Sequence, residues 1–71
     1  MFNFTSSAIE SISDVTDGKV TVTFVGGREY TYAVPNVDQF VSELTSTINA
    51  RGSVGRFVNT AIKSEQLVAS L

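Results

Sequence analysis

The chain has 71 residues, and its seven acidic and five basic side chains give a formal net charge of −2. It contains neither cysteine nor histidine, which excludes disulfides, thiol or imidazole metal ligands, and catalysis by a Ser–His or Cys–His pair. It also lacks the overall basic excess that dedicated double-stranded nucleic-acid binders use to neutralise phosphate.

A chain of this length forms a single domain near the lower limit of what folds alone. Nearly every large apolar residue must therefore be buried, or self-association must help, so a homo-oligomer stays open. Met1–Phe4 lacks the basic segment and long apolar run of a signal peptide. No stretch approaches the roughly 20 apolar residues of a membrane helix. We expect a soluble cytoplasmic protein without a membrane partner.

Residues 8–15 admit two interpretations. The apolar residues Ile9, Ile12 and Val15 lie three apart, as on a helix face, but the serines and the aspartate between them are poor helix-interior residues. A strand with a bulge near residues 11–12 would also direct these side chains inward, and we favour the strand. The Asp and Gly of Thr16–Lys19 then predict a hairpin turn.

Two strands follow, over residues 20–25 and 28–34, and each alternates apolar or aromatic with polar residues. Interpreted as a two-residue loop, Gly26-Gly27 pairs Val25 with Arg28. This register places Tyr30 and Tyr32 on the more polar face, opposite to the valines of the preceding strand. A four-residue connection or a bulge at the glycines would shift the register by one and return the tyrosines to the core.

Two helices complete the chain. Asn36, with Gln39 three residues later, forms a capping-box pattern that begins a helix over 37–49. Gly52 is a plausible stop for it, and Ser53 can cap a second helix over 54–63. Residues 64–71 alternate too weakly to assign and are expected to form a tail. The fold class is α+β: a three-stranded antiparallel β-meander followed by two helices packed on one face, in one domain over 1–71 with its core at about 6–63.

In order and spacing, these elements resemble the KTSC domain. The resemblance covers residues 6–63 and is carried by Ser6-Ser7-Ala8-Ile9 with Ile12, Val22-Thr23-Phe24, Gly27, Tyr30-Thr31-Tyr32, Val34-Pro35, and Ser53-x-Gly55-Arg56-Phe57-Val58-Asn59 with Ile62-Lys63. The family occurs at the C-terminus of some lysyl-tRNA synthetases and as free-standing proteins of bacteria and phages. The resemblance thus implies a bacterial or phage-infected host cell, and the association with the synthetase suggests RNA binding. This chain departs from the family pattern in a longer connection around 45–51 and fewer basic residues near its C-terminus.

The remaining chemistry argues against an enzyme. Gly26-Gly27 lacks the Lys-Ser/Thr of a phosphate-binding loop and opens a strand rather than a helix. Asp14–Gly18 lacks the further oxygen ligands of a calcium loop. We therefore expect no catalytic residue, no metal and no cofactor.

Six residues make up the candidate binding set: Arg28, Tyr30, Tyr32, Arg56, Asn59 and Lys63. The tyrosines either pack in the sheet or form a stacking platform. The residues of the second helix either form an ordinary solvated edge or contact an anion together with Arg28. The leading hypothesis is a non-enzymatic binding module for RNA, single-stranded nucleic acid or a protein partner. The alternative is a self-assembling structural protein, such as one encoded by a phage, that associates through Phe2, Phe4 and a sheet edge.

Overall fold

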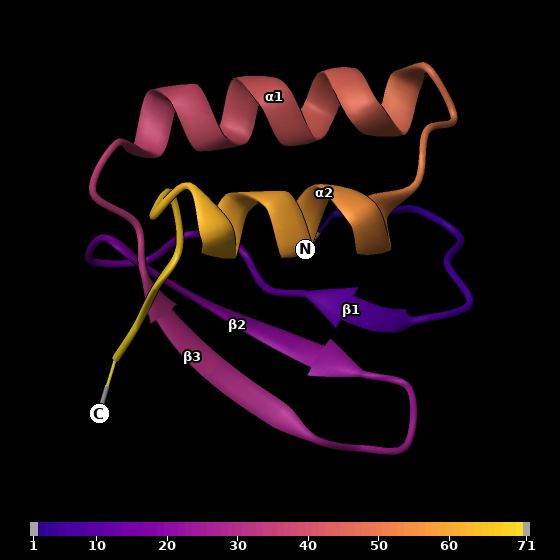
Figure 1. Cartoon of the computed structure of the whole chain (residues 1–71), viewed down its shortest axis with the longest axis horizontal. Helices are drawn as coiled ribbons and strands as arrows, with labels where there is room; N and C mark the ends of the chain where they lie inside the picture. The colour runs from indigo at the N-terminus through magenta and orange to yellow at the C-terminus, as the bar shows by residue number, and fades with distance from the viewer. Residues whose placement is uncertain (1, 71) are drawn as a thin grey trace.

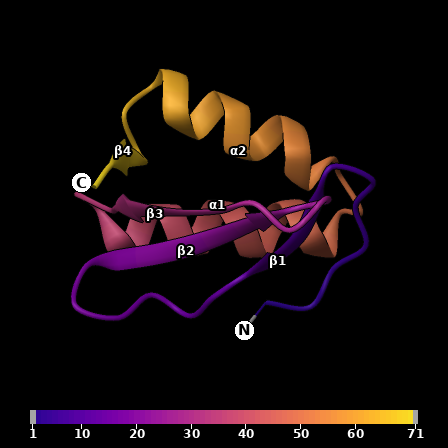
Figure 2. The same cartoon turned by 90° about the horizontal axis from the view of Figure 1, so that it is seen from below.

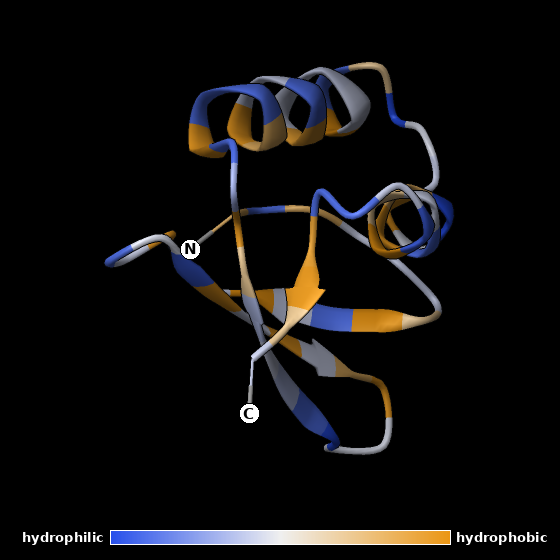
Figure 3. Cartoon of the chain, turned by 60° about the vertical axis from the view of Figure 1, so that its left-hand side comes forward, coloured by the Kyte–Doolittle hydropathy of each residue, from blue (hydrophilic) through white to orange (hydrophobic). Residues whose placement is uncertain are grey.

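A computed structural model describes residues 2–70 of the chain. Four antiparallel strands form one sheet in the order β1-β2-β3-β4, and two helices cover one face of it (Figure 1; Figure 3). The elements are β1 (Ile9–Ile12), β2 (Lys19–Phe24), β3 (Glu29–Ala33), α1 (Val37–Asn49), α2 (Val54–Lys63) and β4 (Val68–Ala69). This arrangement confirms the α+β class and the meander followed by two helices.

The first hairpin has the expected strand and turn. The register between β1 and β2 shifts between Ile9 and Ser11, so the bulge lies at Glu10 rather than at residues 11–12. In the turn, Thr16 and Lys19 exchange backbone hydrogen bonds of 2.9 and 3.0 Å. The φ angles of Asp17 and Gly18 are 55° and 72°, and a positive φ at both central residues defines the type I′ turn that suits a tight hairpin.

The second hairpin corrects the expected register. Its loop has three residues, 25–27, because the Phe24 N–H donates to the Arg28 carbonyl at 2.7 Å. Tyr30 lies opposite Val22 and Tyr32 opposite Val20, so the tyrosines share the face of the valines. The interpretation of Gly26-Gly27 as a two-residue loop is therefore wrong. The structure has the alternative register, shifted by one residue through an extra residue in the loop at the glycines. The two glycines permit it, since their φ angles are 106° and 91°.

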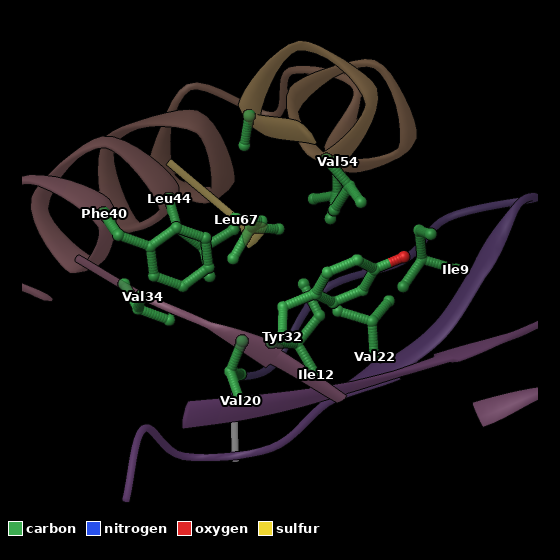
Figure 4. Packing of buried hydrophobic residues seen from close by; sticks show 12 residues of the cluster. Ile9, Ile12, Val20, Val22, Tyr32, Val34, Phe40, Leu44, Val54 and Leu67 are labelled. Atoms are coloured by element: carbon green, nitrogen blue, oxygen red, sulfur yellow. The ribbon is translucent and has the colours of Figure 1, made fainter. Parts of the chain in front are cut away.

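The core lies between this sheet face and both helices. Figure 4 shows the ring of Tyr32 among Ile9, Val22 and Val54. α1 contributes Phe40, whose ring centroid lies 5.7 Å from that of Phe57 on α2. The twelve buried apolar residues are Ile9, Ile12, Val20, Val22, Tyr32, Val34, Phe40, Leu44, Val54, Val58, Ala61 and Leu67.

Residues 64–70 are not the expected tail, and Leu71 lies outside the described residues. Leu67 is 1% exposed, and its neighbours Val68 and Ala69 pair with β3. Gln66 joins this segment to α1, because its Nε2 donates to Glu43 Oε1 at 3.2 Å. The side-chain hydrogen bonds from Gln39 and from Gln66 lower the pKa of Glu43. The C-terminal segment is therefore part of the fold, and the sheet has a fourth strand.

The helices begin at the expected caps. Asn36 Oδ1 accepts from the Gln39 N–H at 3.1 Å, and Ser53 Oγ accepts from the Arg56 N–H at 3.1 Å. The end of α1 differs from the expectation, because Arg51 rather than Gly52 takes the left-handed conformation, with φ 57°. The Gly52 N–H then bonds to the Thr47 carbonyl at 2.8 Å, as in a Schellman motif.

The N-terminal segment lies along the outer edge of β1. The Phe2 N–H donates to the Ile12 carbonyl at 3.3 Å, and Phe2 and Phe4 are half-buried against the core of their own chain. These two rings thus pack partly within their own fold. Across residues 2–70, neither helix has the length and hydropathy needed to span a bilayer.

Candidate binding surface

The end of the molecule that carries the β2–β3 loop has a shallow hollow of about 570 Å³. Its lining residues are Ala8, Phe24, Val25, Gly26, Arg28 and Tyr30. Two of the six candidate residues, Arg28 and Tyr30, therefore share one site. The ring of Tyr30 is available there, since 47% of this residue is exposed.

Phe24 fixes the orientation of Tyr30. The observed register places both residues on the same face of the sheet, on neighbouring strands and diagonally offset. Their ring centroids lie 5.6 Å apart with an interplanar angle of 77°, an edge-to-face contact. Phe24 is itself half-buried against the core. Tyr30 is thus held by its contact with Phe24 on one side and exposed to solvent on the other.

Tyr32 does not belong to this surface. Only 9% of it is exposed, and it is a member of the core. Burial, and then the nearby Tyr30, raises the pKa of the Tyr32 hydroxyl above its usual value of 10.0. The platform interpretation fails for Tyr32 because the one-residue change of register turns its ring toward the helices.

Arg56, Asn59 and Lys63 are all exposed on α2, on the side opposite to the buried Val54 and Val58. Their spacing of three and then four residues forms one strip, about 10 Å long at 1.5 Å per residue. The first turn of α2 lies near the hollow, since a Cβ built on Gly55 would lie 3.2 Å from Ala8 Cβ. Arg56 is accordingly at the end that carries the hollow, whereas Lys63 is at the far end of the helix.

Arg51 is a basic residue at this end that the sequence did not single out. It lines a second hollow, of about 350 Å³, beside the N-terminal segment and the start of α2. The only sequence feature that could have indicated Arg51 is its position next to Gly52, at the expected end of the first helix. Within residues 2–70 no ion pair engages Arg28, Arg51 or Arg56.

The charges are distributed unevenly along the molecule. Three of the five basic residues lie in segments at the end of the molecule that carries the β2–β3 loop: Arg28, Arg51 and Arg56. Two acids, Glu10 and Glu29, lie at the same end. The opposite end has the turn before β2, the start of α1 and the end of α2 (Figure 1). Its charged residues are Asp14, Asp17, Lys19, Asp38, Lys63 and Glu65. A protein that is acidic overall therefore has a locally basic end.

The described part of the chain has no group of three or more Asp or Glu residues that could hold a metal ion. No protein-family model, no curated protein and no solved structure matches this chain. The chemistry of the surface is therefore interpreted from its own geometry: an aromatic ring, a guanidinium beside it and two more guanidinium groups at the same end.

Proposed function

We propose that this chain is a non-enzymatic, KTSC-like binding module that contacts single-stranded nucleic acid, and RNA in particular, with the end that carries the β2–β3 loop. The observation that carries the proposal is the ring of Tyr30, held edge-to-face by Phe24 and half exposed beside Arg28. A base stacked on an aromatic side chain contributes about 1–3 kcal/mol irrespective of sequence. A guanidinium next to that ring can bind the phosphate that follows the base.

The charge distribution also favours nucleic-acid binding at the end that carries the β2–β3 loop. Arg28, Arg51 and Arg56 can approach a flexible backbone, while most acids lie at the opposite end. A single strand can bend to reach arginines on three different segments, which a rigid duplex cannot do as readily. If three phosphates are neutralised, log K should fall with log[salt] with a slope of about −2. The resemblance to a domain of lysyl-tRNA synthetases adds to the case for RNA.

The test is a fluorescence-anisotropy titration with a labelled single-stranded RNA of about ten nucleotides, at low and moderate salt. Tyr30→Ala is expected to weaken binding by about 5–150-fold, the equivalent of one stacked base. Tyr30→Phe keeps the ring and should bind like the wild type.

Arg28→Ala has a matched control in Lys19→Ala, which removes the same charge at the opposite end of β2. We expect only the first to weaken binding markedly. Absence of binding at low salt would refute the proposal, because electrostatic affinity is greatest there. Equal losses in the two variants would refute the site, because the attraction would then depend on net charge alone.

A protein partner is the second candidate, and Val25 favours it. This residue lines the same hollow and is 59% exposed. Val25→Ser separates the two functions, because stacking and phosphate contacts do not use this side chain. The variant should keep its RNA affinity within about two-fold, whereas it should weaken an apolar protein contact.

A further inference from the structure

We propose that the hollow lined by Arg51 binds a small organic acid, whose carboxylate pairs with Arg51 and whose apolar body lies on the floor of the hollow. The volume of this Arg51 hollow is about 350 Å³, near the lower end of the range for small-molecule sites. It shares no lining residue with the hollow that Tyr30 lines. The proposal therefore goes beyond nucleic-acid binding and is tested separately from it.

The Arg51 hollow combines an apolar floor with a polar rim. Val54 is buried, and Phe4 and Ile48 are half-buried against the core, so these three side chains form the floor. The exposed lining residues are Asn3, Thr5, Arg51 and Gly52. Apolar walls with a few polar groups that orient the ligand are typical of small-molecule sites.

The charge of the Arg51 hollow selects an anion. Arg51 is the one charged residue among those that line it, and no ion pair within residues 2–70 engages it. The two segments that form its walls, residues 2–9 and 44–58, contain no Asp or Glu. A carboxylate can accept two parallel hydrogen bonds from a guanidinium. One unpaired guanidinium above an apolar floor thus matches one carboxylate on an apolar body.

Backbone hydrogen bonds hold both walls of the hollow, so the site exists before a ligand binds. The Phe2 N–H donates to the Ile12 carbonyl at 3.3 Å and fixes the N-terminal segment, while the Arg51 N–H donates to the Ile48 carbonyl at 3.0 Å. Figure 2 shows the N-terminal segment passing beside the connection between α1 and α2. A site whose walls are already in place avoids the cost of ordering them when the ligand binds.

The backbone at Arg51 gives a further reason to assign it a function. Its φ of 57° lies in the left-handed region, which residues other than glycine adopt at a cost in stability. Residues held in such conformations cluster at functional sites. Ligand binding by the guanidinium accounts for an arginine at a position where the backbone favours glycine.

An NMR titration of the full, ¹⁵N-labelled chain with sodium benzoate at constant ionic strength tests the proposal. Benzoate joins one carboxylate to one apolar ring. We expect saturable shifts at residues 3–5, 48 and 51–54, with a Kd of about 1 mM for so small a ligand. Benzyl alcohol lacks the charge and inorganic phosphate lacks the apolar body, so each should bind at least about ten-fold more weakly.

Two matched variants locate the anion. Arg51→Gln removes the charge and should weaken benzoate binding by at least about ten-fold. Arg56→Gln makes the same change in the first turn of α2, outside the residues that line the hollow. This control should match the wild type within about two-fold.

Absence of saturable shifts up to about 20 mM benzoate would overturn the proposal, and so would shifts confined to other residues. Equal losses in the two variants would mean that binding depends on net charge. Phosphate that binds as tightly as benzoate would reduce the hollow to a site for any anion. The same spectra report whether Arg51→Gln is folded; if it is not, the comparison of benzoate with benzyl alcohol decides. None of these outcomes depends on RNA.

Discussion

Truncating Leu67 to alanine is expected to lower the free energy of unfolding by about 3 kcal/mol. Leu67 is 1% exposed and packs within the core, and Leu→Ala at such sites costs about 2–5 kcal/mol. A domain of 71 residues has about 4–10 kcal/mol of stability in total. The loss is therefore a large fraction of the whole, and the Tm should fall by about 12–24 °C.

Urea unfolding followed by far-ultraviolet circular dichroism measures this loss. The matched control is Val68→Ala, the adjacent residue, which is 39% exposed and should change stability by less than about 0.5 kcal/mol. Both variants should keep the m-value of the wild type. If Leu67→Ala loses as little as Val68→Ala, the C-terminal segment does not contribute to the core and the reasoning is refuted.

Three further changes follow from the backbone, a titrating group and a cap. Arg51→Gly should stabilise the fold by about 0.5–1 kcal/mol by relieving a left-handed residue, whereas Arg56→Gly inside α2 should destabilise it by about 1 kcal/mol; equal effects would contradict this. Burial, with a smaller effect of Tyr30, raises the pKa of Tyr32 in the folded state. The folded state thus holds this proton more tightly, and its stabilising effect is lost as the pH rises above 10.0 through the folded pKa. Tyr32→Phe should therefore reduce the loss of unfolding free energy above pH 10.0. If the pH dependence of stability is unchanged in this variant, other groups cause the loss. Ser53→Ala should cost about 1 kcal/mol in urea unfolding, and a smaller loss than a few tenths would mean that the cap of α2 is dispensable.

The helices could be predicted from the sequence because their signals are local. Asn36 and Ser53 each bond to a backbone N–H three residues on, so the beginning of a helix is fixed by four consecutive residues. The turn at Asp17-Gly18 is determined in the same way. β4 could not be predicted, since two residues have no measurable periodicity and their pairing depends on the distant β3.

The candidate site was predicted in part. Arg28 and Tyr30 line the same hollow because they are two residues apart, just before and within the start of β3. Tyr32 was misplaced because its exposure depends on the register, which a pair of glycines leaves undetermined. Arg51 joins the same end only through the path of the chain between α1 and α2, which no short-range pattern reports.

The loop between β2 and β3 also restricts how the chain can change length. Side chains of a strand alternate between two faces, so inserting or deleting one residue at 25–27 would expose Tyr32 and carry Thr31 into the interior. A change of two residues would preserve the alternation. Related chains that keep this core should therefore differ at the loop by even numbers of residues, a parity rule that applies to length rather than to composition.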